Sequence, residues 1–139
     1  MAAFVKFETF TEHLAEKVHN LDTDLIKVYL SNTAPNVATH TVKADLAEIA
    51  GGNGYTATGH DTQNATSRAG GVTSVTGVDI VITAAGGSIG PFRYAVLYND
   101  TPAGPVDPLI GYWDYGSAIT VLDTETFTVD VGASILTIT

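Results

Sequence analysis

The sequence predicts a mainly β protein, an antiparallel β-sandwich or a jelly-roll-like barrel with one N-terminal α-helix. The second half of the chain consists of short runs rich in β-branched and aromatic residues, separated by turn signals that contain Gly, Pro or Asp. Only one segment, near the N-terminus, has the apolar spacing of a helix. Strands do not alternate with helices along the chain, which argues against a parallel sheet.

The helix is expected over about residues 10–19, where apolar residues recur at four-residue intervals. Thr9 is the expected N-cap, with Glu12 three residues later, as in a capping box. Leu14 and Val18 lie on the apolar stripe and are therefore expected to be buried against the sheet.

Strands and loops are expected along the rest of the chain. A first strand is predicted over residues 25–31, and a short helical turn over 45–50 with Asp45 as its N-cap. Residues 51–71 are rich in Thr, Gly, Ser and Asn and predict a long polar loop with at most one edge strand. The other expected strands are 72–75, 79–83, 92–98, 109–114, 119–122, 127–131 and 135–138, with one of the turns at Tyr115–Ser117.

The length of 139 residues fits a single domain, residues 1–139, with one hydrophobic core. The chain contains no cysteine, which excludes disulfides and thiolate metal ligands. We therefore expect packing, or contact with neighbouring subunits, to supply the stability.

The chain is strongly acidic, with 6 Lys and Arg against 15 Asp and Glu and a formal net charge of −9. Nucleic-acid binding depends on neutralising phosphates with Lys and Arg, so we expect no nucleic-acid partner. The sequence shows neither the apolar segment of a signal peptide nor the roughly 20-residue apolar run of a membrane span. We expect no membrane partner, and folding in the cytoplasm of the cell that makes the protein.

The sequence contains no recognisable catalytic or cofactor-binding motif, so we expect a protein that is not an enzyme and needs no cofactor. No Gly-x-Ser-x-Gly nucleophile motif occurs. The glycine-rich run at 51–54 is not followed by the Gly-Lys-Ser/Thr of a phosphate loop and is expected to be a backbone turn.

Carboxylates and histidines show no spacing typical of an active site. Three glutamates at four-residue intervals predict a solvated helix face, and four acidic residues fall near strand ends without marking a glycosidase pair. They are Glu8, Glu12 and Glu16, and Asp114, Asp123, Glu125 and Asp130. His13 and His19 are six residues apart and are expected to point in different directions, and His40 and His60 fall in loops. We expect surface histidines and no metal site.

The candidate interface is the aromatic cluster of Tyr112, Trp113 and Tyr115. Alternation along a strand places Trp113 and Tyr115 on one face and Tyr112 on the other. Three interpretations remain open: a core tryptophan, a protein-interface anchor, and a carbohydrate-binding platform that Tyr94 and Tyr98 would extend. We expect Trp113 in the core, and Tyr112 or Tyr115 partly exposed.

Seven segments, spread along most of the chain, resemble in order and spacing a family of small structural proteins of tailed bacteriophages, similar to virion components encoded near the head genes. The segments are Phe7–Phe10, Leu14–Leu21, Glu48–Ala50, Gly52–Tyr55, Gly87–Tyr94, Leu97–Asp100 and Gly111–Gly116. The resemblance implies a virion structural protein and brings no catalytic motif with it.

The most specific expectation from this resemblance is a capsid decoration, or cement, protein on the outer surface of the phage head. An acidic surface suits a position that faces water instead of DNA. The expected partners are the major capsid protein and other copies of the chain, with a trimer favoured over a dimer on a symmetric lattice. The alternatives are a tail or head–tail adaptor protein, a carbohydrate-binding module, and a small hydrolase.

Overall fold

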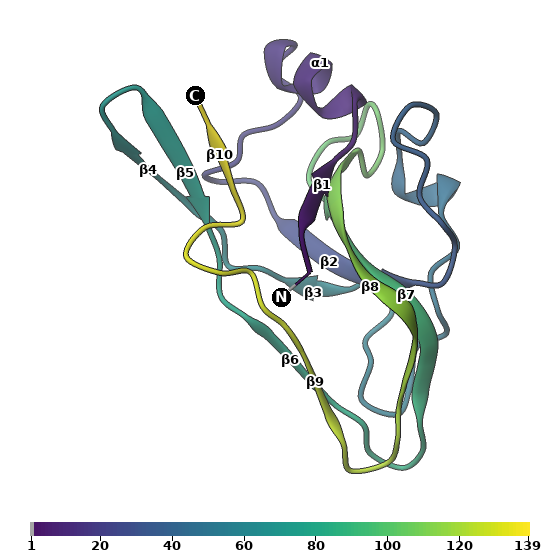
Figure 1. The fold of residues 1–139 in the computed structure, drawn as a ribbon. Coiled ribbons are helices and arrows are strands. Elements are labelled where there is room, and N and C mark those ends of the chain that lie inside the picture. Colours follow the sequence, from purple (N-terminus) through teal and green to yellow (C-terminus); the bar gives the residue numbers. More distant parts are fainter. Residues whose placement is uncertain (1) are drawn as a thin grey trace.

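The structure is a computed structural model that describes residues 2–139 (Figure 1). The predicted class is confirmed: the chain is mainly antiparallel β with one N-terminal α-helix, and its sheets are sandwich-like without closing into a barrel. The elements are β1 (Phe4–Lys6), α1 (Thr9–Ala15), β2 (Ile26–Ser31), the 3₁₀ turn η1 (Lys43–Asp45), β3 (His60–Asp61), β4 (Ala65–Ala69), β5 (Val72–Thr76), β6 (Ile80–Thr83), β7 (Ile89–Asn99), β8 (Leu109–Val121), β9 (Thr126–Val129) and β10 (Leu136–Ile138).

The strands form three antiparallel sheets. The largest has the order β1-β8-β7-β2-β3, a second has the order β10-β5-β4, and β6 and β9 form a two-stranded ribbon. In Figure 1 the hairpin of β4 and β5 projects beside β10, while the two connections that join β6 to β7 and β8 to β9 lie at the end of the molecule away from α1. Within residues 2–139, no helix is long and apolar enough to cross a membrane.

Strand β8 is longer than predicted, because the expected turn at Tyr115–Ser117 does not form. The strand continues through these residues to Val121. Tyr94 on β7 pairs with Asp114, and Phe92 pairs with Ile119, so β8 advances from 114 to 119 while β7 covers only 94 to 92. The extra residues form a β-bulge in which Gly116 has a φ of 88°. Glycine here permits the bulge and does not end the strand.

The N-terminal region also differs from the prediction. Residues 4–6 form the unpredicted edge strand β1, in which Phe4 pairs with Trp113. The helix begins earlier and ends four residues sooner than expected, at Ala15. Its N-cap residue is Glu8, whose side chain makes no capping hydrogen bond, so the predicted capping box at Thr9 is wrong. Lys17 has a φ of 64°, which turns the chain away from the helix axis.

The segment between β2 and β3 lies against one face of the large sheet. The expected helical turn after Asp45 is wrong, because the 3₁₀ turn ends at this residue. Its carboxylate instead reaches back to accept hydrogen bonds from the backbone N–H groups of Thr41 and Val42, and these bonds hold the pKa of Asp45 below its usual range. Gly59 packs so closely on β2 that a Cβ atom would lie 2.3 Å from the carbonyl oxygen of Val28.

The predicted polar loop at residues 51–71 contains two strands. His60 and Asp61 form β3 at the edge of the large sheet, and residues 65–69 form β4. Strand β4 is largely exposed on both of its faces, so the burial pattern that usually identifies a strand is missing from its sequence.

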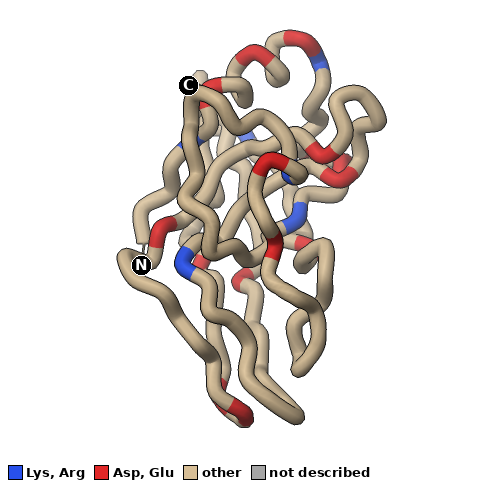
Figure 2. The backbone as a smooth tube through the Cα atoms, turned by 90° about the vertical axis from the view of Figure 1, so that its right-hand side faces the viewer, with Lys and Arg blue, Asp and Glu red and all other residues tan. Residues whose placement is uncertain are grey.

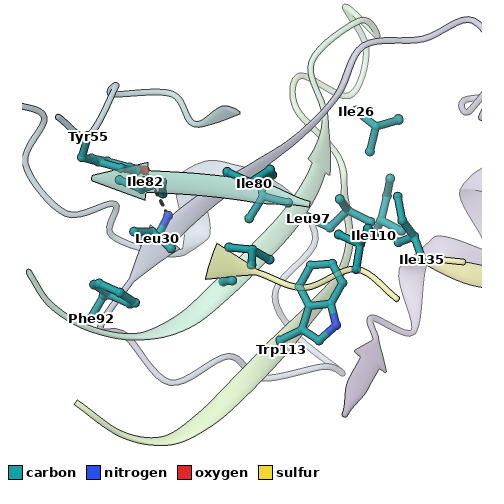
Figure 3. Packing of buried hydrophobic residues seen from close by; sticks show 14 of the residues in the cluster. Ile26, Leu30, Tyr55, Ile80, Ile82, Phe92, Leu97, Ile110, Trp113 and Ile135 are labelled. Carbon is teal, nitrogen blue, oxygen red and sulfur yellow. Dashed lines mark hydrogen bonds between the residues drawn. The ribbon is translucent and has the colours of Figure 1, made fainter. Parts of the chain in front are cut away.

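Two clusters of buried side chains lie on opposite faces of the large sheet. The larger one fills the space between this sheet and the other two, and Figure 3 shows Trp113, Leu97 and Ile110 within it. The smaller one, beneath the β2–β3 segment, contains Phe7, Tyr29, Leu46, Tyr94, Val96, Tyr98 and Leu109. The central strands are therefore covered on both faces.

Candidate interface around strand β8

Trp113 is a core residue, as the strand alternation predicts. Its indole is 3% exposed and belongs to the larger buried cluster. On the sheet it lies between Phe4 of β1 and Ala95 of β7, and its ring centroid is 5.2 Å from that of Phe4. Trp113 is therefore unavailable to a partner, and the candidate interface loses its largest predicted anchor.

Tyr112 lies on the opposite face and is partly exposed. Its ring packs between Phe7, at a centroid distance of 5.5 Å, and Tyr94, at 6.0 Å. Val5, the residue opposite it on β1, is 36% exposed. Tyr98, which would extend an aromatic surface here in the carbohydrate-binding interpretation, is fully buried. The accessible aromatic surface is therefore small, and Tyr112 is its centre.

An ion pair borders Tyr112. The guanidinium of Arg93 donates to both carboxylate oxygens of Asp114, from Nε to Oδ1 at 2.8 Å and from Nη2 to Oδ2 at 3.1 Å. The guanidinium also lies 5.4 Å from the ring centroid of Tyr94. Arg93 and the backbone N–H of Gly116 hold the pKa of Asp114 below its usual range. The pair presents a planar cation and a carboxylate beside an aromatic ring.

Tyr115 faces the other side of the sheet from Tyr112. The bulge places its ring 5.1 Å from that of Phe127, at the margin of the larger buried cluster. Burial raises the pKa of Tyr115 to about 12. Because Tyr112 and Tyr115 lie on different faces and Trp113 is buried, the three predicted residues do not form one continuous surface.

The acidic residues expected near strand ends support turns, except Asp114, which lies within β8 at its bulge. Each accepts a hydrogen bond from a backbone N–H, and none of the four lines either of the two hollows beneath α1. The bonds run from Gly116 to Asp114, from Gly86 to Asp123, from Leu122 to Glu125 and from Gly132 to Asp130. This geometry stabilises turns and gives no support to the glycosidase interpretation.

A polar network that the sequence did not reveal centres on Glu48. One carboxylate oxygen binds Lys43 Nζ at 2.8 Å. The other accepts hydrogen bonds from the Tyr55 hydroxyl at 2.6 Å and from the Thr58 backbone N–H at 2.8 Å. The Tyr55 hydroxyl also accepts a bond from the Leu30 backbone N–H (Figure 3). Both oxygens of Glu48 are thus occupied, and the network fastens the β2–β3 segment to strand β2.

Two histidines are buried together, contrary to the expectation that they are surface residues pointing in different directions. The chain reversal at Lys17 brings the ring of His19 to 6.0 Å from that of His13. Among residues 2–139, no group of three or more potential ligands is placed to hold a metal ion. Burial, followed by the neighbouring His13, lowers the pKa of His19 to about 4.

Hydrogen bonding fixes the neutral form of His19. The Thr101 backbone N–H donates to Asn99 Oδ1, which orients the Asn99 amide. Its Nδ2 then lies 3.1 Å from His19 Nδ1 and 2.7 Å from Asp24 Oδ2. Because Nδ2 is a donor, His19 Nδ1 accepts and the proton resides on Nε2. Protonation of Nδ1 would break this bond.

Helix α1 leaves two hollows beneath it, which together we call the α1 groove. A hollow of about 420 Å³ lies between the chain that follows α1 and the β10-β5-β4 sheet, and one of about 270 Å³ lies between β1 and β10. Leu14 and Ile138 line both hollows, so the two adjoin each other at these side chains. The expectation that Leu14 and Val18 are buried is wrong, since both are only half-buried, and the helix buries Phe10 and His13 instead.

Three comparisons with known proteins found no match. No protein-family model matches the chain, and neither does any curated protein or any solved structure.

Proposed function

We propose that this chain is a structural protein of a bacteriophage particle, and that it decorates the outer surface of the capsid. The observation that carries the proposal is the β4–β5 hairpin. Ala65, Ser67, Arg68 and Ala69 of β4 are exposed although the strand is regular, and its outer edge pairs with no other strand. A strand that is open on both faces and along one edge is a surface suited to contact with another chain.

The charge distribution supports the outer position. Figure 2 shows acidic positions along the whole length of the molecule and few basic ones. Three of the six Lys and Arg residues are neutralised by ion pairs within the chain, namely Lys27 with Asp100, Lys43 with Glu48 and Arg93 with Asp114. Such a surface repels packaged DNA and favours the solvent side of a shell.

The proposed partners are the major capsid protein and other copies of this chain, in a trimer in preference to a dimer. A decoration protein contacts a symmetric lattice, and copies around a three-fold axis meet through different patches of their surfaces. Open strand edges at β1, β3, β4 and β10 provide such patches. The resemblance of the sequence to virion proteins encoded near head genes supports the same assignment.

The proposal is tested on purified particles of the phage that encodes this chain. We expect mass spectrometry to detect the chain in the particles, and cryo-electron microscopy to place it on the outer face of the capsid at a fixed ratio to the capsid protein. Density on the tail or at the portal would support the tail or adaptor alternative instead. Absence of the chain from particles would refute a virion role.

A carbohydrate-binding module is the second candidate, because Tyr112 lies beside the exposed Arg93–Asp114 pair. An aromatic ring next to planar hydrogen-bonding groups is a plausible sugar platform. A glycan array separates the two functions: binding that disappears in Tyr112→Ala but persists in Tyr115→Ala would favour the module. Tyr115 is the matched control, since it is an aromatic residue of the same strand on the other face.

A further inference from the structure

The α1 groove is an incompletely filled surface, and apolar side chains form much of its walls. Phe4, Leu14, Val18, Leu136 and Ile138 line it, and each of these side chains is only half-buried. Covering them would remove apolar area from water, at roughly 25 cal/mol per Å². The groove is therefore a surface on which an apolar side chain from outside would be stabilised.

The unpaired basic side chains at the groove indicate which chemical groups a bound segment would carry. Within residues 2–139, three basic side chains make no ion pair: Lys6, Lys17 and Arg68. Lys6 lines the smaller hollow and Lys17 the larger one. Two of the three unpaired cations of a chain with a net charge of −9 thus lie at one groove. An occupant with an apolar side chain and flanking carboxylates complements this arrangement.

Two acidic residues, Asp22 and Asp24, also line the larger hollow beside Lys17, and one oxygen of each carboxylate already accepts hydrogen bonds. Asp22 Oδ1 accepts hydrogen bonds from the Thr66 hydroxyl and backbone N–H. Asp24 Oδ2 accepts from Asn99 Nδ2 and from the Asn20 backbone N–H. The two lysines therefore remain the groups with free hydrogen-bonding capacity for an incoming carboxylate.

The β8–β9 turn of this chain has the required chemistry. Leu122 is 57% exposed at this turn, and the exposed carboxylates of Asp123 and Glu125 flank it. Each of these carboxylates accepts one backbone N–H within the turn region and keeps further acceptor capacity. The turn lies at the opposite end of the molecule from α1 (Figure 1), so it is out of reach of the groove of its own chain.

We propose that the β8–β9 turn of one copy docks into the α1 groove of the next copy. Leu122 enters the groove between Leu14 and Val18, and the carboxylates of Asp123 and Glu125 approach Lys6 and Lys17. The two surfaces are different patches of the chain, so the contact is heterologous, as the proposed trimer requires, and differs from the contact of a two-fold dimer. This inference rests on the proposed function and deepens it, because it identifies the two surfaces through which copies of the chain contact each other.

The absence of cysteine from the chain makes the contact easy to trap. A Leu122→Cys chain is mixed with a Val18→Cys chain that carries a different tag, and the mixture is oxidised. We expect a disulfide-linked heterodimer of the two tagged chains. The control pairs Leu122→Cys with Val106→Cys, because Val106 is 62% exposed and does not line the groove. No cross-link, or equal cross-linking in both mixtures, would overturn the proposal.

Charge reversal provides a second, independent test. We expect Lys17→Glu to weaken self-association by about tenfold in sedimentation measurements, because it places like charges together. Arg68→Glu, which changes the net charge equally at an unpaired cation outside the groove, should have little effect. Combining Lys17→Glu with Glu125→Lys should restore association. Equal weakening by the two glutamate variants, without restoration, would indicate a general charge effect and refute the docking.

Failure of this inference is distinguishable from failure of the proposed function. The cross-link and the sedimentation series use purified protein and report only contact between copies. Mass spectrometry of particles reports only presence on the virion. If the chain is found on particles but gives no specific cross-link, the proposed function stands and the docking is refuted. If the specific cross-link forms but the chain is absent from particles, the docking stands and the virion role is refuted.

Discussion

The centre of the large sheet and the end that carries α1 differ in how completely they are packed. Residues 94–98 of β7 are all at most 7% exposed, because one buried cluster covers each face of the strand. At the α1 end, apolar side chains of the helix and of β10 are half-buried and enclose the α1 groove. The centre thus has the features of a finished core, whereas the α1 end is incompletely packed, and the proposed docking would complete it.

Truncation of Trp113 should give the largest effect and confirm the finished core. Trp113→Ala removes a 3% exposed indole from the larger cluster, so we expect a loss of about 3–5 kcal/mol in unfolding free energy. Urea unfolding followed by circular dichroism measures it, since the variant lacks its only tryptophan. Tyr112→Ala on the partly exposed face is the control and should cost clearly less. Equal losses would show that the two faces are packed alike.

Protonation of His19 should produce the next largest effect and links the two regions, because Asn99 of β7 holds this histidine of the α1 end. Its pKa is lowered from 6.5 to about 4 in the folded state. Between these values the unfolded chain binds more protons, so stability is present above pH 6.5 and falls as the pH decreases toward 4, by up to about 3 kcal/mol. Two titratable neighbours contribute to this shift: His13 lowers the pKa of His19 further, and Asp24 raises it.

The control for this pH dependence is His19→Gln, whose unfolding free energy should vary less between pH 6.5 and 4 than that of the unmodified chain. Protonation of carboxylates contributes to both proteins and cancels in the difference. If the unfolding free energies of the two proteins varied with pH in parallel, the pKa of His19 would be the same in the folded and unfolded chains, and the prediction would be wrong.

The Glu48 network tests whether the β2–β3 segment belongs to the finished core. Glu48→Ala leaves the Lys43 ammonium, the Tyr55 hydroxyl and the Thr58 N–H without their acceptor. We expect a loss of about 2 kcal/mol in thermal or urea unfolding. Glu16→Ala, at an exposed glutamate of the α1 end, should change the stability by less than about 0.5 kcal/mol. A similarly small change for Glu48→Ala would show that the segment is held by packing alone.

The sequence predicted those features that depend on local alternation. The apolar and aromatic runs located most strands, and the period of two placed Trp113 and Tyr112 on opposite faces. The prediction failed where a residue type is common in two different structures, as glycine is in turns and in β-bulges. Glycine at position 116 predicts a turn after a strand that ends at Asp114, but its positive φ occurs within a bulge that lets β8 continue. Strand β4 gave no alternating pattern, because neither face is buried.

The site-level features were missed because they depend on the path of the chain. Lys17 adopts a positive φ although it is not glycine, so the sequence does not predict the chain reversal that brings the rings of His13 and His19 together. The acceptor role of Glu48 toward Tyr55 exists only after the glycine-rich segment folds back on β2. Periodicity does not encode such contacts.

Substitutions of Leu14 should have the smallest effect on the unfolding free energy, and they test most directly whether the α1 end is incompletely packed. Leu14 is half-buried and lines both hollows, so Leu14→Ala should cost about 1 kcal/mol, well below the 2–5 kcal/mol of a fully buried leucine. Enlargement is the sharper test. Leu14→Phe should be tolerated, because the added ring enters free volume, whereas Ala95→Leu in the filled centre should be clearly destabilising by overpacking. Urea unfolding of the two variants compares the regions directly. If Leu14→Phe were as damaging as Ala95→Leu, the α1 end would be as tightly packed as the core, and the case for a docking groove would fail with it.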